Sequence, residues 1–265
     1  MQRSAGAARV SVDGGRLTGL SQSGSAKALL PRSYGPAPEI VFLNTSGGLT
    51  SGDRLDYGVD LGPATRATAT TQTAERAYRA DGIPAQARVA LTVGAGGILD
   101  WLPQETILFN GAKLDRETVV DLAEGAHFLG LETIVLGRAA MGETVTRLSL
   151  RDRRIIRRNG RVQVFDPFRL DDASLARAAG PALLQGARAV AVLILSAPGA
   201  EDQLPALRTA LTEPDVTAAA SALPGRVILR AHAPDAWPLR RQIARLIQIL
   251  RPGALPRVWQ SQEVT

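Results

Sequence analysis

RRIIRRNGRVQVFD, residues 153–166, carries the clearest local fold signal in the chain. Asn159-Gly160 stands between two β-rich runs, Arg154–Arg158 and Arg161–Asp166. A type I′ turn needs positive φ at both of its central residues, and Asn followed by Gly meets that need most readily. The stretch therefore predicts a β-hairpin.

Short β-rich runs also fill the sequence before this hairpin, separated by Gly, Pro, Asn or Asp. They are Ile40–Leu43, Leu55–Leu61, Ala64–Thr71, Ala87–Val93, Ile98–Leu102, Thr106–Phe109, Lys113–Val120, His127–Leu136 and Thr144–Leu150. Regularly spaced short strands are typical of a sandwich, a barrel or a coil of sheets, whereas βαβ folds alternate strands with helices. We therefore predict a β body over about residues 8–166.

The last third of the chain changes character. We expect a buried strand, a short helix, a second strand and an amphipathic helix, over Ala187–Leu195, Gln203–Leu211, Arg226–Ala231 and Pro238–Leu250. The last helix has apolar residues at helical spacing and ends at Arg251-Pro252-Gly253. The Ala-rich segment Ala173–Pro181 fits either a helix or a loose connector. We predict a single domain over residues 1–265, with a mixed α/β part of about residues 187–259 after the β body.

Composition excludes several classes of site. Apolar residues make up 45% of the chain and charged residues 21%, as in globular proteins. The absence of Cys excludes a disulfide framework, a thiolate metal site and a cysteine nucleophile. With only His127 and His232, the latter expected in a loop, one chain cannot assemble a multi-His metal centre. No nucleophile–His–acid arrangement and no HExxH motif stands out, so we expect a protein that is not an enzyme.

The net charge of +6 is compatible with acidic partners. Seven arginines fall between Arg147 and Arg161, with Asp152 as the only acid among them. This segment fits a solvated strand face, a docking patch for an acidic protein, or a nucleic-acid site. The lack of interleaved aromatic residues for base stacking disfavours the nucleic-acid site.

No segment predicts export or membrane anchoring. The first residues, MQRSAGAARV, lack the apolar core of a secretory signal. The longest purely apolar run, Ala189–Leu195, is far shorter than the roughly 20 residues of a membrane-spanning helix. We therefore expect a cytoplasmic protein without a membrane partner.

Two glycine-rich stretches are predicted to be turns. NTSGGLTSGD, residues 44–53, looks at first like a phosphate cradle, but it lacks the Gly-Lys-Ser/Thr ending and a clear following helix. A tight turn, in which glycine permits positive φ or close backbone approach, explains the stretch more simply. Gly94–Gly97 is interpreted in the same way.

Acidic residues placed among apolar ones are more informative. Strand alternation puts Glu105 on the face of Ile107 and Phe109. A carboxylate directed toward a core is costly unless it is hydrogen-bonded, paired or lining a wet cavity. One interpretation is therefore a salt bridge to one of the many arginines, and the other is a water-filled path between sheets.

Glu132 fits the same pattern, because alternation puts it on the face of Ile134 and Leu136. The orientation of Asp53, Glu75 and Glu143 does not follow from the sequence. Two such carboxylates could also perform glycosidase chemistry.

Five blocks stand out in chain order: NTSGGLTSGDRL (44–55), TTQTAERAYR (70–79), LDWLPQETILF (99–109), GRAAMGE (137–143) and LPRVW (255–259). They span nearly the whole chain, and WLPQETILF is the most distinctive. Together they resemble the UreD family, also called UreH, of urease accessory proteins. The resemblance implies a mainly β fold with stacked β-sheets in a β-helix-like or sandwich body. It also implies about two α-helices, mostly in the C-terminal third.

The resemblance further implies a chaperone or scaffold in urease maturation. The expected partners are the accessory proteins UreF and UreG and the urease apoenzyme, and a dimer of the accessory complex is left open. Nickel is expected to pass from UreG through UreF and UreD to the urease active site. GTP hydrolysis would belong to UreG, in agreement with the missing P-loop.

A protein that passes nickel on needs weak ligands. Tightly held Ni²⁺ prefers imidazole or thiolate, which this chain almost lacks, whereas carboxylate oxygens and water are easily replaced. We therefore expect no tightly bound cofactor and only a transient passage of Ni²⁺. Our hypothesis is that Glu105 and Glu132, with Asp53, Glu75 and Glu143 behind them, line or gate a hydrated passage.

Two other classes of function stay open. A carboxylate-based carbohydrate enzyme would place two acids on one open groove. A basic nucleic-acid-binding protein would depend on Arg153 to Arg161 and lose affinity steeply with salt. Nucleic acid, like a membrane, is a partner that we do not expect.

Overall fold

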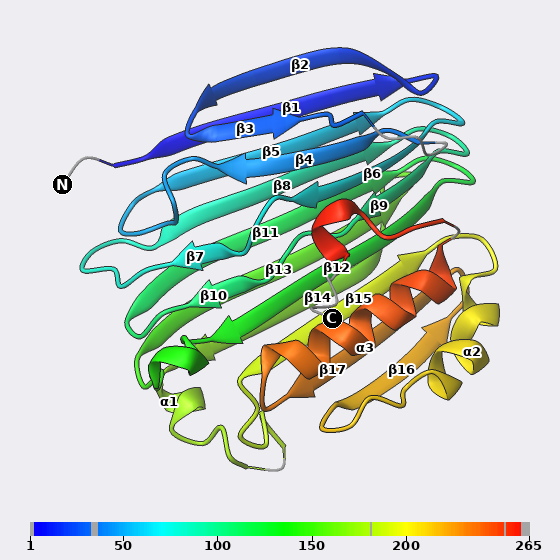
Figure 1. The fold of residues 1–265 in the computed structure, drawn as a ribbon. Coiled ribbons are helices and arrows are strands. Elements are labelled where there is room, and N and C mark those ends of the chain that lie inside the picture. The colour runs from blue at the N-terminus through cyan, green and yellow to red at the C-terminus, as the bar shows by residue number, and fades with distance from the viewer. Residues whose placement is uncertain (1–2, 33–36, 181, 252, 261–265) are drawn as a thin grey trace.

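The computed structural model describes residues 3–32, 37–180, 182–251 and 253–260. Its strands form two sheets that stack face to face (Figure 1). The first is a seven-stranded sheet, in order β14 (Arg161–Asp171), β13 (Leu148–Arg158), β11 (Ala112–Leu122), β8 (Ala85–Val93), β5 (Arg54–Leu61), β1 (Ala5–Asp13) and β2 (Arg16–Gly24). The second is a ten-stranded sheet, in order β16 (Thr217–Leu223), β17 (Arg226–Ala233), β15 (Ala189–Ser196), β12 (His127–Leu136), β9 (Ile98–Trp101), β6 (Arg66–Thr71), β4 (Glu39–Asn44) and β3 (Ala26–Leu29), with β10 (Thr106–Leu108) and β7 (Glu75–Ala77) branching from β12.

The chain coils between these two sheets. From β4 it crosses to β5, returns to β6, crosses to β8, returns to β9, and continues in this way to β13. Each crossing adds one strand beside the previous one, so that β5, β8, β11 and β13 pair in parallel, as do β4, β6, β9 and β12. The predicted mainly β fold with stacked, β-helix-like sheets is therefore confirmed.

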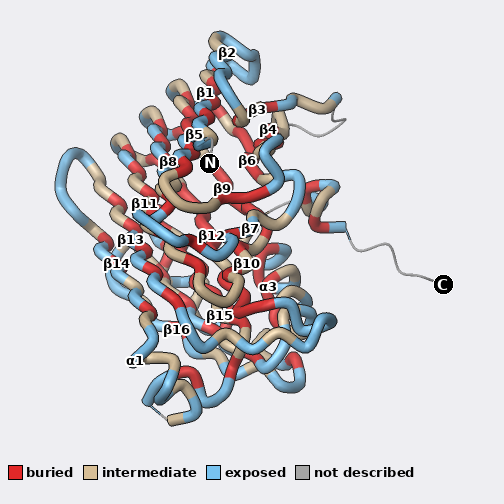
Figure 2. The backbone as a smooth tube through the Cα atoms, turned by 90° about the vertical axis from the view of Figure 1, so that its left-hand side faces the viewer, coloured by how far each residue is buried: buried red, intermediate tan, exposed pale blue. Residues whose placement is uncertain are grey.

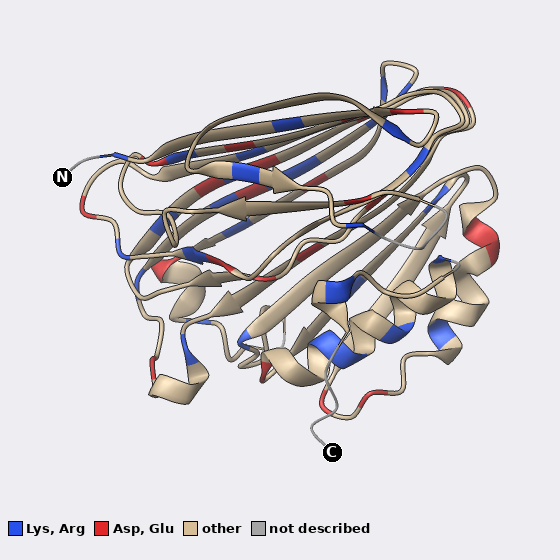
Figure 3. Cartoon of the chain, turned by 45° about the horizontal axis from the view of Figure 1, so that its top comes forward, with Lys and Arg blue, Asp and Glu red and all other residues tan. Residues whose placement is uncertain are grey.

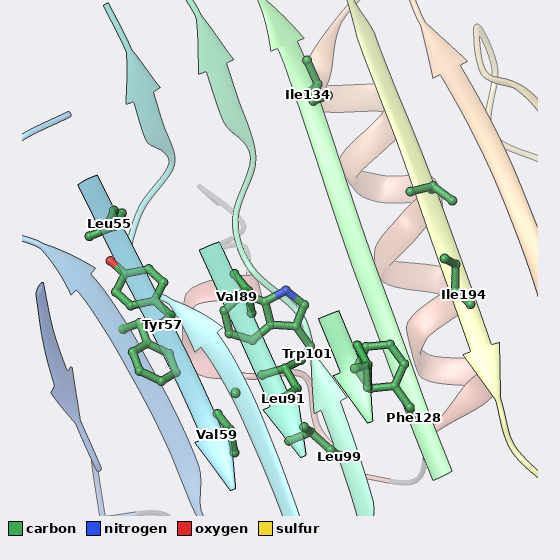
Figure 4. Close-up of a cluster of buried hydrophobic side chains, with 14 of the residues drawn as sticks. Leu55, Tyr57, Val59, Val89, Leu91, Leu99, Trp101, Phe128, Ile134 and Ile194 are labelled. Atoms are coloured by element: carbon green, nitrogen blue, oxygen red, sulfur yellow. The ribbon is translucent and has the colours of Figure 1, made fainter. Parts of the chain in front are cut away.

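Alternation along each strand builds the core. In β11 every second residue from Ala112 to Leu122 is buried, and the residues between them are polar or charged apart from Val119. Seen edge-on, the buried residues lie between the two sheets (Figure 2). Tyr57, Leu91 and Trp101 are among the side chains that meet there (Figure 4). Burial of apolar surface between the sheets thus stabilises the coil.

The predicted hairpin is confirmed. β13 and β14 pair antiparallel around Asn159 (φ 49°) and Gly160 (φ 74°), the two positive φ values that the turn requires. The expected strand Thr144–Leu150 is wrong at its start, because β13 begins only at Leu148 and continues to the hairpin.

The C-terminal part adds three strands to the ten-stranded sheet and covers its outer face with helices. The covering helices are α2 (Leu204–Thr209) and α3 (Ala236–Leu250), whereas α1 (Asp172–Leu175) packs against β13 and β14. The 3₁₀ turns are η1 (Ala139–Met141), η2 (Ala200–Gln203) and η3 (Arg257–Trp259). In α3, Leu239, Ile243 and Leu246 form a buried stripe, and the Asp235 side chain accepts a hydrogen bond from the Trp237 N–H at the start of the helix. No helix in the described part of the chain is long and apolar enough to cross a membrane.

Several segments differ from the prediction. β1, β2 and β3 were not expected, because Ala, Gly and Ser dominate them and give little strand signal. The Ala-rich β16 was missed for the same reason. His232 was expected in a loop, but β17 runs two residues further than predicted and includes it. The segment expected as a helix or connector begins with the short helix α1, and its last residue, Pro181, lies outside the described residues.

Candidate functional site

A cavity of about 80 Å³ lies between the two sheets. Its lining includes Glu75 from β7, Glu132 from β12 and Arg116 from β11, together with the rings of Tyr57 and Trp101. One water needs roughly 10–15 Å³ in a polar cavity, so there is space for several. The structure thus brings two of the five acids singled out in the sequence to one space that is large enough for water.

Glu132 points into this space from the face that the sequence predicted, because Ile134 and Leu136 belong to the same inter-sheet core. Its Oε1 accepts hydrogen bonds from Trp101 Nε1 (3.3 Å) and Thr118 Oγ1 (3.1 Å). Its Oε2 lies 2.8 Å from Arg116 Nη1. The salt bridge considered for this residue is therefore present, and it borders a cavity as well.

Glu75 sits in the same cavity without such a partner. Asn44 Nδ2 lies 3.3 Å from each of its carboxylate oxygens, and the Arg76 backbone N–H donates to Oε1 at 3.1 Å. Among the described residues it forms no ion pair. Burial raises the pKa of Glu75 to about 7, and these hydrogen bonds offset the effect only in part. Near neutral pH this carboxyl therefore exchanges its proton readily.

A row of charges continues from Glu132, buried up to Asp166 and ending at the exposed Arg230. Arg116 donates to Asp152 through Nε (2.9 Å) and Nη2 (2.7 Å), and Arg154 Nη1 donates to the same carboxylate at 2.6 Å. Arg154 Nε then reaches Asp166 Oδ2 at 2.7 Å, and Arg230 of β17 closes the row on the other oxygen of Asp166. Three arginines and three acids thus alternate across the inter-sheet space, and we call these six residues the charge ladder.

Two further cavities adjoin the first. One of about 20 Å³ has Trp101, Glu132 and Arg154 in its lining, and one of about 440 Å³ lies around Glu132, Arg154 and Asp166. The larger one lies where the edge strands β14 and β16 leave the two sheets open toward each other. Glu132 is common to the lining of all three spaces, which follow one another along the charge ladder, and we call them the chain of cavities.

Asp53 and Glu143 occupy turns instead. The carboxylate of Asp53 accepts from the backbone N–H groups of Ser4 (2.7 Å) and Thr50 (2.9 Å) and is buried. Glu143 accepts from the backbone of Asn110 (3.0 Å) and from Arg138 Nε (2.9 Å), and these contacts lower its pKa despite some burial. Neither residue lines the chain of cavities, and their part in a nickel passage stays a prediction.

Glu105 lies on the opposite face of the ten-stranded sheet from Glu132. It directly precedes β10, and its Oε2 lies 3.7 Å from Arg240 of α3. Ile107, two residues further, packs against the core under α3, whereas Thr106 lines the inter-sheet cavity. The salt bridge expected for Glu105 is present, and its hypothesised part in a nickel passage is open to test with the variant Glu105→Gln.

The arginine-rich segment divides between two faces of β13. Arg154 points inward to the charge ladder, and Arg158 donates to the backbone oxygens of Ala123 and Ala126. On the outer face, Arg153 and Arg157 lie opposite acids of β11, and residues of both signs alternate across these strands (Figure 3). A solvated, internally paired face is thus the interpretation that the structure favours over a nucleic-acid site.

The Gly-rich block is a turn, as predicted. Gly47 and Gly52 have positive φ values of 78° and 76°. A Cβ on Gly48 would lie 2.4 Å from a ring carbon of Tyr78 and 2.7 Å from the Arg76 oxygen, so glycine permits a close approach of two loops. A backbone bridge joins Leu49 to Ala77 at this point.

Comparison with known proteins supplies the family. The model of the UreD urease accessory protein family matches residues 4–260. The chain belongs to the UreD family. It is 62% identical to the urease accessory protein UreD of Paracoccus denitrificans over 98% of this chain and 93% of the relative. It is 51% identical to that of Jannaschia sp. over 98% of this chain and 96% of the relative. A role in urease maturation follows from the family.

The blocks that resemble this UreD family meet in space. The Tyr78 and Phe109 rings are 4.8 Å apart edge to face, and the Arg138 guanidinium lies 4.5 Å above the Phe109 ring. These residues come from three blocks, and Gly47, from a fourth, accepts a hydrogen bond from the Tyr78 hydroxyl at 3.1 Å. Four of the five blocks therefore build one end of the sheets, beside Glu75.

The described residues hold no group of three or more His, Cys, Asp or Glu side chains that could bind a metal ion. The acids at the cavity are instead single carboxylates, each held by hydrogen bonds or by an arginine. Such carboxylates are weak, exchangeable ligands for a divalent cation. Arg116 and Asp166 were missed as cavity residues, and Asp152 as the buried partner of Arg116, because their roles depend on pairing between strands.

Proposed function

We propose that this chain is a non-catalytic scaffold that bridges apo-urease and the accessory proteins UreF and UreG and lets nickel pass to urease. The cavities around Glu132 support the proposal, because they place carboxylate oxygens beside space between the sheets that a hydrated cation could use. Nickel is cargo here, so weak oxygen ligands suit the task better than imidazole or thiolate. A dimer of the whole accessory complex belongs to the same proposal.

Glu75 and Glu132 have different tasks in this proposal. Glu75 forms no ion pair with any residue that the structure describes, and because burial raises its pKa to about 7, a cation that binds it replaces a proton in part of the molecules. Glu132 already faces Arg116, so a cation there competes with a guanidinium. Both carboxylates would therefore hold nickel only briefly.

The experiment is urease activation with the variants Glu75→Gln, Glu132→Gln and the double variant. Each is coexpressed with UreF, UreG and urease, and the nickel content and activity of the purified urease are measured. We expect the double variant to deliver severalfold less nickel while the accessory complex still copurifies. Glu124→Gln, at an exposed acid, is the matched control and should activate normally.

The result that contradicts the passage is equally clear. Full nickel content with the double variant, in an intact complex, would show that these carboxylates do not take part in transfer. Loss of copurification would instead show that they support the assembly. The bridging role is tested separately, by whether urease and UreF still copurify when this chain is left out.

A further inference from the structure

Arg116 lies where the first cavity meets the charge ladder. Its side chain is only 7% exposed, and every edge of the guanidinium is occupied. Nε and Nη2 donate to Asp152, and Nη1 reaches both Glu132 Oε2 (2.8 Å) and Thr106 Oγ1 (2.9 Å). The group is thus a fixed cation between two carboxylates, at the edge of a hydrated space.

A divalent cation would bind at the position that the Arg116 guanidinium occupies, between Glu132 and Asp152. Two buried carboxylates without a counterion repel each other, and removing them from water costs several kcal/mol per ion. Arg116 neutralises them before any cargo arrives, and its pKa is raised by Asp152 and Glu132 despite burial, so it stays charged. A cation entering the cavity therefore meets a carboxylate that is already satisfied.

The two acids differ in how firmly Arg116 holds them. Asp152 receives two hydrogen bonds from Arg116 and a third from Arg154, so it is fully engaged. Glu132 receives a single contact from Arg116, through Nη1, and that nitrogen keeps Thr106 as a second acceptor. A passing cation can therefore bind transiently to Glu132, while the ion pairs in the rest of the charge ladder stay intact.

We propose that Arg116 is the positioning residue that keeps the cavity from trapping a divalent cation. It acts through Glu132, by competing for Oε2, and it confines the exchangeable part of the ladder to that one carboxylate. This inference rests on the nickel passage proposed above, and it adds the residue that keeps the Ni²⁺ affinity of the passage low. Without the guanidinium, Glu132 and Asp152 would become a site that retains the cation.

The test is a titration of the full-length chain with Ni²⁺ as the probe. Arg116→Met removes the cation at similar length, and we expect its Ni²⁺ affinity to exceed that of the wild type by roughly tenfold or more. The double variant Arg116→Met/Glu132→Gln should return to the wild-type value, because the released carboxylate is gone. Arg116→Lys keeps a positive charge and should stay within about threefold of the wild type.

An unchanged Ni²⁺ affinity in folded Arg116→Met overturns the proposal, and so does a gain that persists in the double variant. Should Arg116→Met fail to fold, Arg116→Gln is titrated instead, since its amide can still donate to one carboxylate, and an unchanged affinity again overturns it. In urease activation, Arg116→Met should deliver less nickel and Arg116→Lys should restore delivery. Normal activation with the double variant Glu75→Gln/Glu132→Gln would refute the passage itself, whereas the Ni²⁺ affinity of Arg116→Met tests only the role of Arg116.

Discussion

Both faces of the ten-stranded sheet bury acidic side chains, but the surroundings of these side chains differ between the two faces. Toward the seven-stranded sheet, Glu75 and Glu132 border a cavity. Toward α3, Asp100 lies 2.8 Å from Arg251, and Glu105 lies 3.7 Å from Arg240. The arginines on this second face come from α3 and from the residue directly after it, and each of them pairs with one of these acids.

The difference shows that residue type alone does not make a carboxylate exchangeable. Asp100 is as buried as Glu132, and burial raises its pKa although Arg251 and Thr68 stabilise its charge. Yet its carboxylate is held by Arg251, directly after α3, and by Thr68, and Trp259 donates to the Leu102 oxygen at 2.8 Å two residues further along the chain. Free space next to the carboxylate is what the inter-sheet face adds.

The largest expected effect concerns the charge ladder. Asp152→Asn removes the charge that both Arg116 and Arg154 share, and it leaves two buried guanidinium groups with one acid fewer. Breaking a buried pair costs about 3–5 kcal/mol, so we expect a loss of that size in the free energy of unfolding, measured with urea. Asp115→Asn on the solvent face of β11 is the control and should cost less than about 1 kcal/mol. Equal losses would show that the ladder does not stabilise the inter-sheet face.

Glu75→Gln should change the pH dependence of stability. The folded state holds this proton to about pH 7, and the unfolded state loses it near pH 4.5, so wild-type stability falls as pH rises through that window. At pH 8 we expect the variant to be more stable than the wild type by up to about 3 kcal/mol, and at pH 4 the two should agree. Unfolding curves at pH 4, 6 and 8 measure this, with Glu124→Gln as the flat control. A pH-independent difference would refute the raised pKa.

Much of this fold could be predicted from periodicity, because strand alternation and turn residues act locally. β12 begins and ends where its β-rich run does, and the Asn159-Gly160 turn follows from backbone sterics. β1 and β2 could not be found in that way, since small residues such as Ala7, Ala8 and Gly19 become strands only by pairing.

The site was predictable only in part. Strand alternation predicted that the Glu132 side chain points toward the space between the sheets, because that direction depends only on the residues of its own strand. Glu105 follows the same alternation of side chains. Which face of its sheet borders a cavity, however, depends on α3, which lies over 130 residues away in sequence. The charge ladder joins five strands of both sheets, and its pairing follows from registers that no local pattern contains.

On the helix face, Glu213→Gln should have a smaller effect than Asp152→Asn. Glu213 is buried, but its partners Arg241 and Arg245 are 52% and 43% exposed, so solvent screens the pairs. We expect a loss of about 1 kcal/mol or less in the free energy of unfolding, decreasing further at high salt. Asp215→Asn in the same loop, at an exposed residue with positive φ that Asn also tolerates, is the control. A salt-independent loss as large as that of Asp152→Asn would remove the contrast between the two faces.

Glu105→Gln is expected to have the smallest effect, and it tests the contrast most directly. Its carboxylate is 29% exposed and 3.7 Å from Arg240, a distance at which a partly exposed ion pair contributes less than about 0.5 kcal/mol. Arg240 keeps Gln104 Oε1 at 2.6 Å and the Trp259 ring at 4.4 Å, so the helix stays anchored without Glu105. Urease coexpressed with this variant should therefore acquire its normal nickel content, in contrast to urease coexpressed with the Glu75→Gln/Glu132→Gln variant. If nickel delivery fell while the complex copurified, the route would have to cross the ten-stranded sheet beside β10, and carboxylates on both of its faces would belong to it.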